Sequence, residues 1–264
     1  MKRTDLLTLR RNILVLLFVC VSFFYFLGSA SAYVIGLTTP GKWGTPVFGT
    51  PGGTVTWSLM GTGVDLTSEP YGFSTTLSSF MPVGFKAEIE SAFGAWSSVA
   101  DITFLEVPDL GEPFNAPGDS GHIRIGGHSF DEMGGVLAHG YFQPDNSVTA
   151  AGDIHFDIDE TWVLTDPEDG FTIFRVAAHE IGHAIGLDHE PPSITALMNP
   201  FYTETTPLGL LADDIAGAQS IYGPAVTAVP EPRAIMLLGI GVLGMLGYGW
   251  RRRKQPNRTL ILII

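Results

Sequence analysis

The side chains best suited to chemistry stand in one eleven-residue stretch that runs from His179 to His189. His179 and His183 are four residues apart, and residues with that spacing project from the same face of a helix. Two imidazole nitrogens are thereby offered to one zinc ion at about 2.0–2.1 Å. Glu180 sits one step around the helix, where it can reach a water molecule bound to that ion.

Gly186 and His189 extend this pattern to a third ligand. Glycine adopts backbone conformations closed to other residues, so Gly186 lets the chain leave the helix and return with His189. Three neutral nitrogens leave one zinc position open, where the pKa of a bound water falls toward ~7 and Glu180 can take its proton. The alternative is a helix whose histidines are only core or surface residues. It is disfavoured because a core helix rarely carries three histidines and a glutamate on adjoining faces.

The elements that must position this site show strand and helix periodicities in turn. Strands are expected at 55–59, 102–107, 123–128 and 154–157. Helices are expected at 85–99, 171–185 and 211–222. The glycine-rich stretch 131–153 is expected to be loop, with a short apolar piece around 137–142. This order predicts an α+β fold, a twisted mixed sheet of about five strands with three helices packed on it.

The charge distribution limits the partners of this fold. The net charge is −13, and residues 33–228 hold four basic residues against 25 acids. Nucleic-acid binding needs a basic face, so no nucleic-acid partner is expected. Such acidity suits oxygen-ligated cations, or simply solubility. The single cysteine, Cys20, lies in an N-terminal apolar run, so a chain that loses this run has neither a disulfide nor a cysteine metal ligand.

The first 32 residues have the three parts of a secretory signal. Basic residues come first, an apolar run from Ile13 to Leu27 follows, and Ala30-Ser31-Ala32 supplies the cleavage site. Cleavage is expected after Ala32, and the alternative is an uncleaved anchor helix. An exported protein of this kind is expected at the cell surface or outside the cell.

The C-terminus carries a second apolar segment between two short motifs. Pro230-Glu231-Pro232 precedes the apolar stretch 234–250, and the basic cluster 251–254 follows it. This order resembles the PEP-CTERM sorting signal of Gram-negative bacteria. The resemblance implies an exosortase-type processing enzyme as partner, cleavage near the motif, and a transmembrane helix that anchors the chain at least transiently. The alternative is a plain membrane anchor.

The histidine motif resembles that of the metzincin metallopeptidases, which carry a methionine turn shortly after it. Ala196-Leu197-Met198-Asn199-Pro200 is similar to the matrixin form of that turn. Pro200 occupies the place where astacin-like and serralysin-like metzincins have a tyrosine that can reach the zinc. The resemblance implies a zincin-like catalytic domain with His179, His183 and His189 as zinc ligands, Glu180 as general base, and Gly186 and Met198 in structural roles. It also implies a monomeric zinc endopeptidase that cleaves extracellular proteins or peptides.

Two segments, 130–139 and 152–162, are similar to matrixin segments that hold a structural zinc and calcium. The resemblance assigns His139 and His155 to zinc. Carboxylates assigned to calcium are Asp131, Asp157 and Glu160, with Asp153 at another calcium site. Carbonyl groups of Glu132, Gly134 and Val136 would complete the calcium shell, since calcium takes several hard oxygen ligands.

The sequence departs from the matrixin pattern before His139. Matrixins usually supply a His-x-Asp pair about fifteen residues earlier, and this chain has Arg124-Ile125-Gly126 there. His128 is the nearest replacement, so the second zinc site is expected to use His128, His139, His155 and an unidentified fourth ligand. The alternative is that these groups form only a solvated loop.

The domain division that follows is a signal peptide (1–32), a matrixin-like domain (33–225) and a linker with sorting tail (226–264). The acids of the segment 211–217, which resembles the last matrixin helix, either cap that helix or receive a free N-terminus. A second function class is a non-catalytic surface or matrix protein whose fold is held together by metal ions. A zinc ion with only a structural role would not need Glu180, which counts against this class. A third is an integral membrane protein that keeps both apolar ends.

Overall fold

The computed structural model describes residues 33–36, 41–68, 70–143, 150–165, 170–203 and 205–226. The expected signal peptide and the apolar C-terminal stretch 234–250 lie outside these residues. The chain divides into two units, Met1–Ala225 and Val226–Ile264, and every described element belongs to the first. Within the described ranges, no helix is long and apolar enough to cross a membrane.

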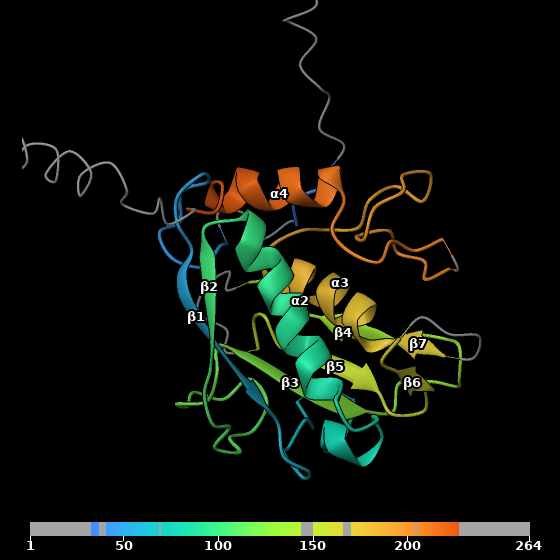
Figure 1. Ribbon diagram of the computed structural model, residues 1–264. Helices are drawn as coiled ribbons and strands as arrows, with labels where there is room; N and C mark the ends of the chain where they lie inside the picture. Colours follow the sequence, from blue (N-terminus) through green and yellow to red (C-terminus); the bar gives the residue numbers. More distant parts are fainter. Residues whose placement is uncertain are drawn as a thin grey trace, which may run out of the picture. The chain divides into compact units, whose positions relative to one another are not determined.

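One five-stranded mixed sheet forms the centre of the first unit, in the order β2-β1-β3-β5-β4 (Figure 1). The strands are β1 (Gly53–Leu59), β2 (Ile102–Glu106), β3 (Ile123–His128), β4 (Ala138–Gly140) and β5 (Ile154–Asp157). Strands β2, β1, β3 and β5 are mutually parallel, and β4 pairs antiparallel with β5 at the edge. The mixed α+β architecture expected from the sequence is confirmed.

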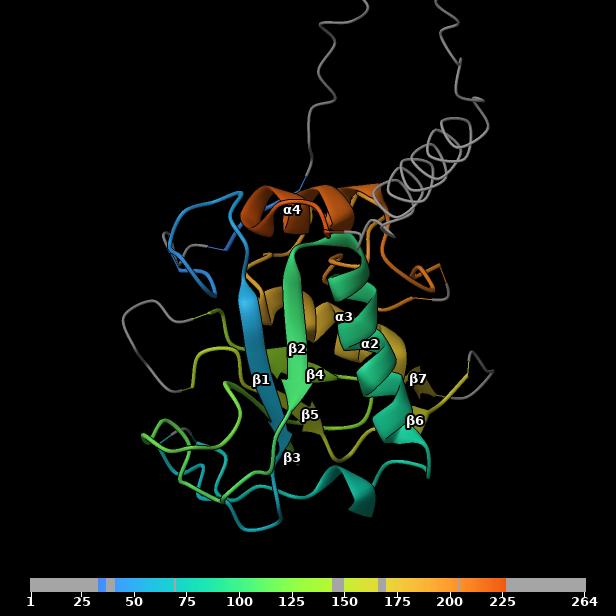
Figure 2. The same cartoon turned by 60° about the vertical axis from the view of Figure 1, so that its left-hand side comes forward.

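Three α-helices accompany the sheet: α2 (Phe85–Val99), α3 (Ile173–Ala184) and α4 (Ala212–Tyr222). The face of α2 that carries Ile89, Phe93 and Trp96 is buried, as its spacing predicts. The indole Nε1–H of Trp96 donates to the carbonyl oxygen of Ala178 at 2.9 Å, which ties α2 to α3. Figure 2 shows these two helices side by side next to the sheet, with α4 across one end.

The site-bearing helix lies over the sheet because its own inner residues are apolar. Ile173, Ala177 and Ile181 of α3 are fully or almost fully buried, and they join one core with the inward residues of β3 and β5. Burial of each large side chain contributes about 1.5–3 kcal/mol, so this face fixes the orientation of α3. The histidines of α3 consequently face away from this core contact.

Four short elements were not expected from the sequence. The helix expected at 171–185 begins only at Ile173, because β7 (Phe171–Thr172) pairs in parallel with β6 (Trp162–Val163). Strand β4 lies in a stretch expected to be loop, and a 3₁₀ turn, η1, spans Leu77–Ser79. Strand β4 is only three residues long, so its pairing with β5 decides its conformation rather than its own sequence.

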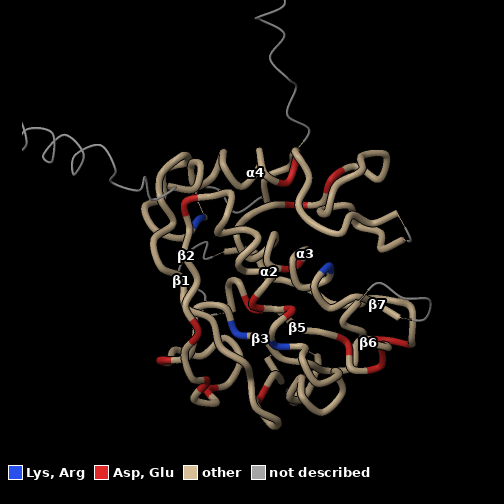
Figure 3. The backbone as a smooth tube through the Cα atoms, in the orientation of Figure 1, with Lys and Arg blue, Asp and Glu red and all other residues tan. Residues whose placement is uncertain are grey.

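Acidic residues are spread over the described part of the chain, whereas basic ones are few (Figure 3). Lys42, Arg124 and Arg175 are buried, which leaves Lys86 as the one basic side chain near the surface of the described ranges.

Candidate active site

Helix α3 supplies the first two histidines and the glutamate. His179 and His183 lie one turn apart, and His183 is buried while His179 is partly exposed. Beneath them, Gly182 faces Met198, and a β-carbon at position 182 would lie 2.3 Å from the methionine sulfur. The absence of a side chain at Gly182 lets the buried Met198 pack directly under the helix.

The end of α3 turns at Gly186, as the sequence predicts. Gly186 has φ +105°, a conformation that residues with a side chain rarely adopt. A β-carbon there would also lie 2.2 Å from Nε2 of Gln143. The turn brings His189 back toward the helix.

The three histidines converge on one point. Their Nε2 atoms are 3.2 Å apart between His179 and His183, 3.1 Å between His183 and His189, and 3.2 Å between His189 and His179. The Nδ1–H of His179 donates to the carbonyl oxygen of Leu197, and that of His183 donates to Leu187, both at 2.7 Å. A carbonyl can only accept, so these two rings carry the proton on Nδ1 and turn lone pairs at Nε2 toward the centre.

This arrangement fits a zinc ion. Three nitrogens bound at about 2.0–2.1 Å with tetrahedral angles are about 3.3–3.4 Å apart, close to the separations of this trio. Burial lowers the pKa of His179 to about 4 and that of His183 to about 3, and it also lowers the pKa of His189. All three imidazoles are therefore neutral near pH 7, the form that binds a metal.

Glu180 lies beside the trio with its carboxyl group enclosed. It is only 6% exposed, and burial raises its pKa to about 8, an effect that a hydrogen bond from the N–H of Gly140 partly offsets. Its Oε2 atom is buried and has no protein partner. A carboxyl group whose pKa lies near neutrality can both accept a proton and return it.

The segment below the trio is held by Asp214 of α4. Its carboxylate accepts hydrogen bonds from the N–H groups of Leu197 (3.0 Å), Met198 (3.1 Å) and Leu211 (2.7 Å). Asp214 thus caps α4 and also fixes the turn whose Leu197 carbonyl orients His179. The sequence suggests the capping role but gives no signal for the second one.

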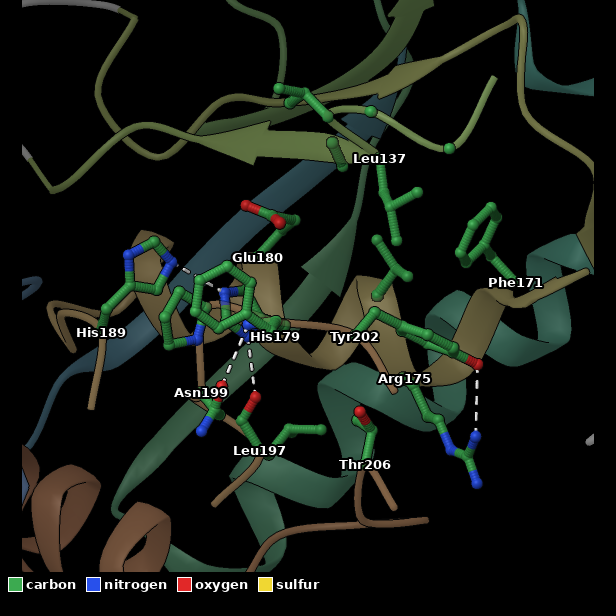
Figure 4. A pocket seen from close by; sticks show the side chains of 17 residues that line it. Leu137, Phe171, Arg175, His179, Glu180, His189, Leu197, Asn199, Tyr202 and Thr206 are labelled. Carbon is green, nitrogen blue, oxygen red and sulfur yellow. Dashed lines mark hydrogen bonds between the residues drawn. The ribbon is translucent and has the colours of Figure 1, made fainter. Parts of the chain in front are cut away.

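A pocket of about 450 Å³ opens beside the trio (Figure 4). Figure 4 shows His179, Glu180 and His189 on one side of it, with Phe171 and Arg175 on the other. The hydroxyl of Tyr202 accepts a hydrogen bond from Nη1 of Arg175 at 3.2 Å and donates one to Oγ1 of Thr172 at 3.1 Å. No sequence pattern points to Arg175, and its burial, which is unusual for an arginine, becomes visible only in the fold.

A second histidine trio forms where β3, β4 and β5 run together. His128, His139 and His155 each offer one ring nitrogen, and these atoms lie within 4.8 Å of one another. Burial lowers the pKa of His139 to about 4 and that of His155 well below its ordinary value. The structure therefore brings together the three histidines that the sequence analysis selected.

The acids expected at a calcium site gather around the loop 131–136. Glu160 accepts the N–H of Gly134 at 2.7 Å, and Asp131 accepts the N–H of Val136 at 3.1 Å. Buried oxygens of Asp157 and Glu160 have no protein partner. Burial raises the pKa of Glu160, and the charges of Asp157 and Asp131 raise it further. Such mutual repulsion suits a divalent cation, although the three carboxylates do not meet within 4.8 Å as the histidines do.

Asp153 lies in a different environment. Its buried carboxylate accepts the backbone N–H of Arg124 at 2.8 Å and is attracted to the guanidinium of that residue. Arg124 in turn forms an ion pair with Asp109 at 2.8 Å. A protein cation therefore stands next to Asp153, and among the described residues Asp153 belongs to no group of three converging metal-ligand side chains.

The chain belongs to the matrixin family of peptidases, whose family model matches residues 67–223, more than half of its length. The match spans both histidine trios and α4. A second model, that of the PEP-CTERM protein-sorting motif, matches residues 228–254.

Individual relatives agree with this assignment. The chain is 43% identical over 157 residues to matrix metalloproteinase-16 of Homo sapiens. The aligned region covers 56% of this chain and 25% of the relative. It is 39% identical over 148 residues to stromelysin-3 of Mus musculus, with 54% and 28% covered. It is 41% identical over 162 residues to the hatching enzyme of Paracentrotus lividus, with 58% and 25% covered. The chain thus spans about a quarter of the length of these relatives.

The role of Asp214 is testable by replacement with alanine. Asp214→Ala leaves three backbone N–H groups without their acceptor, each at a cost of about 1–3 kcal/mol where water cannot replace it. We expect a large drop in the free energy of unfolding in urea and weaker zinc retention in chelator competition. Asp213→Ala, one residue earlier and less buried, is the matched control with little expected effect. Equal behaviour of the two variants would contradict the role of Asp214.

Proposed function

We propose that this chain is an exported zinc endopeptidase whose catalytic domain is 33–225. The observation that carries the proposal is the convergence of three neutral imidazole nitrogens within 3.2 Å, next to the enclosed carboxyl group of Glu180. His179, His183 and His189 hold the ion in this proposal. Zinc bound there supplies a Lewis acid for the scissile carbonyl and lowers the pKa of bound water.

Glu180 carries the proton through the reaction. Its carboxylate accepts a proton from the attacking water and returns it to the leaving amine, for which a pKa near neutrality is suitable. The N–H of Gly140 holds the carboxyl group in place from strand β4. Gly186, Met198 and the carbonyl groups behind the rings keep the ligands oriented.

Strand β4 and the pocket give a means of holding a peptide. Strand β4 ends the sheet and contacts α3, and its residue Ala138 lines the pocket beside the trio. An extended peptide can add to such an edge through main-chain hydrogen bonds, while alternate side chains enter pockets. The pocket beside Glu180, with Phe171, Val176 and Leu197 among its lining residues, would receive the side chain next to the cleaved bond.

The other proposed metal-binding residues would stabilise the fold rather than take part in catalysis. We assign His128, His139 and His155 to a second zinc, and Asp131, Asp157 and Glu160 to calcium. Asp153 is the weakest of the proposed calcium ligands, because burial raises its pKa well above the ordinary value and a protein cation, Arg124, already lies beside it. Metals bound at these loops would stabilise the folded chain by mass action.

The two ends of the chain would direct the protein to its location. The sorting motif at 228–254 supports export and association with the surface. We propose removal of 1–32 on export and processing of 226–264 by an exosortase-type enzyme in a Gram-negative bacterium, with membrane anchoring beforehand. Extracellular proteins would then be the substrates.

The alternative function is a non-catalytic surface protein that keeps the metal sites for stability alone. The enclosed Glu180 favours the enzyme, because burying a carboxyl group costs folding free energy and a protein that keeps its metals for stability alone gains nothing from that cost. A casein or gelatin digest with and without a chelator separates the two functions, since the alternative predicts no cleavage in either case.

Replacement of Glu180 by alanine tests its role as general base. The variant should retain zinc, because the three ligands are untouched, and should lose peptide cleavage. Metal analysis and a fluorogenic peptide assay measure the two properties on the same sample. Glu90→Ala, at an exposed glutamate of α2, should keep both. Normal cleavage by Glu180→Ala would refute the proposed general base.

Replacement of Arg175 by leucine tests what limits the depth and selectivity of the pocket. Arg175→Leu removes the guanidinium that bonds Tyr202 and leaves a deeper, more apolar pocket. We expect kcat/KM for peptides with a large apolar residue after the cleaved bond to rise about tenfold relative to those with a small one. Peptide-library profiling measures this ratio, with Lys86→Leu on α2 as control. An unchanged ranking of peptides would show that Arg175 does not limit the pocket.

A further inference from the structure

The second histidine trio differs from the first in the environment of its centre. In the part of the chain that the structure describes, no carboxylate oxygen joins His128, His139 and His155 within 4.8 Å. Three neutral imidazoles leave a divalent ion with its full charge and, in a tetrahedral site, one position to fill. A fourth ligand is therefore required, an inference that rests on the second zinc proposed above.

The rings are oriented toward a shared ligand. The Nδ1–H of His128 donates to the carbonyl oxygen of Ser129 at 3.0 Å, which leaves Nε2 as an unprotonated atom that is buried and has no protein partner. Nε2 of His139 lies 3.0 Å from Nδ1 of His155. His128 and His155 are 2% and 0% exposed, so water satisfies these atoms poorly.

The walls around the trio are aromatic. Tyr71 stacks on His128 with ring centroids 4.1 Å apart, and Phe130 packs against the same ring at 4.0 Å. Phe114 lies 5.4 Å from the ring of His155 and Tyr141 lies 4.9 Å from that of His139. Uncompensated charge is unfavourable in such surroundings, so a buried divalent ion needs an anionic partner.

The acids closest in sequence each keep one buried carboxylate oxygen without a hydrogen-bond partner, but neither acid joins the group of atoms that converges at the trio. Asp157 shares a face of β5 with His155, but its Oδ1 accepts the N–H of Asp159 at 3.0 Å, on the side of the calcium loop. Asp153, on the same face, is bonded to the backbone of Arg124. Neither carboxylate belongs to the group of atoms that converges at the trio.

We propose that His128, His139 and His155 form a three-histidine metal site whose fourth position binds a small monodentate anion from solution. The anion offsets the charge that the aromatic walls cannot solvate. His139 is only partly buried, so the site can be reached from the surface. The site is then an anion-responsive metal centre separate from the trio of α3, rather than a closed structural one.

The test uses cobalt(II) in the full chain and azide as the anion. His189→Ala removes an exposed ligand of the first trio, so that the visible cobalt bands report the second trio. We expect one bound cobalt and a saturable shift of its bands with azide. The matched control, His189→Ala with His139→Ala, should lose both the bands and the shift. Cobalt bands that do not change with azide would show that a protein ligand fills the fourth position. If no cobalt bands appear, the three histidines do not form a metal site. Either result would overturn the proposal.

A second measurement keeps the test decisive if His189→Ala does not fold. Cadmium-113 spectra of the otherwise unaltered chain should contain a resonance that His139→Ala removes, and azide should move that resonance. A resonance that stays in place, or none that depends on His139, would overturn the proposal. Neither readout involves peptide cleavage, so failure of the proposed enzyme activity gives a different result from failure of the anion site.

Discussion

Three unshared electron pairs directed at one point are the constraint on which this structure depends. His179 and His183 each commit their Nδ1 proton to a backbone carbonyl, so their Nε2 atoms cannot bond to one another although they are 3.2 Å apart. Bringing acceptors this close in a partly buried site is unfavourable unless a cation lies between them. The trio therefore explains why so much of the surrounding fold serves to hold these rings.

The support for the trio comes from segments far apart in the chain. The carbonyls of Leu187 and Leu197 orient two rings, Asp214 of α4 fixes the turn that contains Leu197, and Gly182 admits Met198 beneath the helix. The same helix buries an apolar face against the sheet, which sets its rotation. The backbone N–H of Gly140 in strand β4 donates a hydrogen bond to the carboxyl group of Glu180, so the edge of the sheet also helps to position this group.

Much of this follows from the sequence, because spacing determines which side chains share a helix face. The periodicity predicted α2, α4 and four strands, and the motif predicted that His179, His183 and His189 would converge. Strand β4 and the pairing of β6 with β7 were not predicted, since their conformation depends on partners distant in sequence. Every residue has a backbone carbonyl, so the sequence does not show which carbonyls accept hydrogen bonds from the histidines. The contacts of Leu187 and Leu197 therefore could not be predicted. Arg175 and Tyr202 meet only through the fold.

The most direct test of the trio is a crystal structure of natively purified protein with anomalous diffraction recorded at the zinc edge. A peak within bonding distance of Nε2 of His179, His183 and His189, with the carboxyl group of Glu180 beside it, is the predicted result. Rings that point apart, or density without a transition metal between them, would contradict the account.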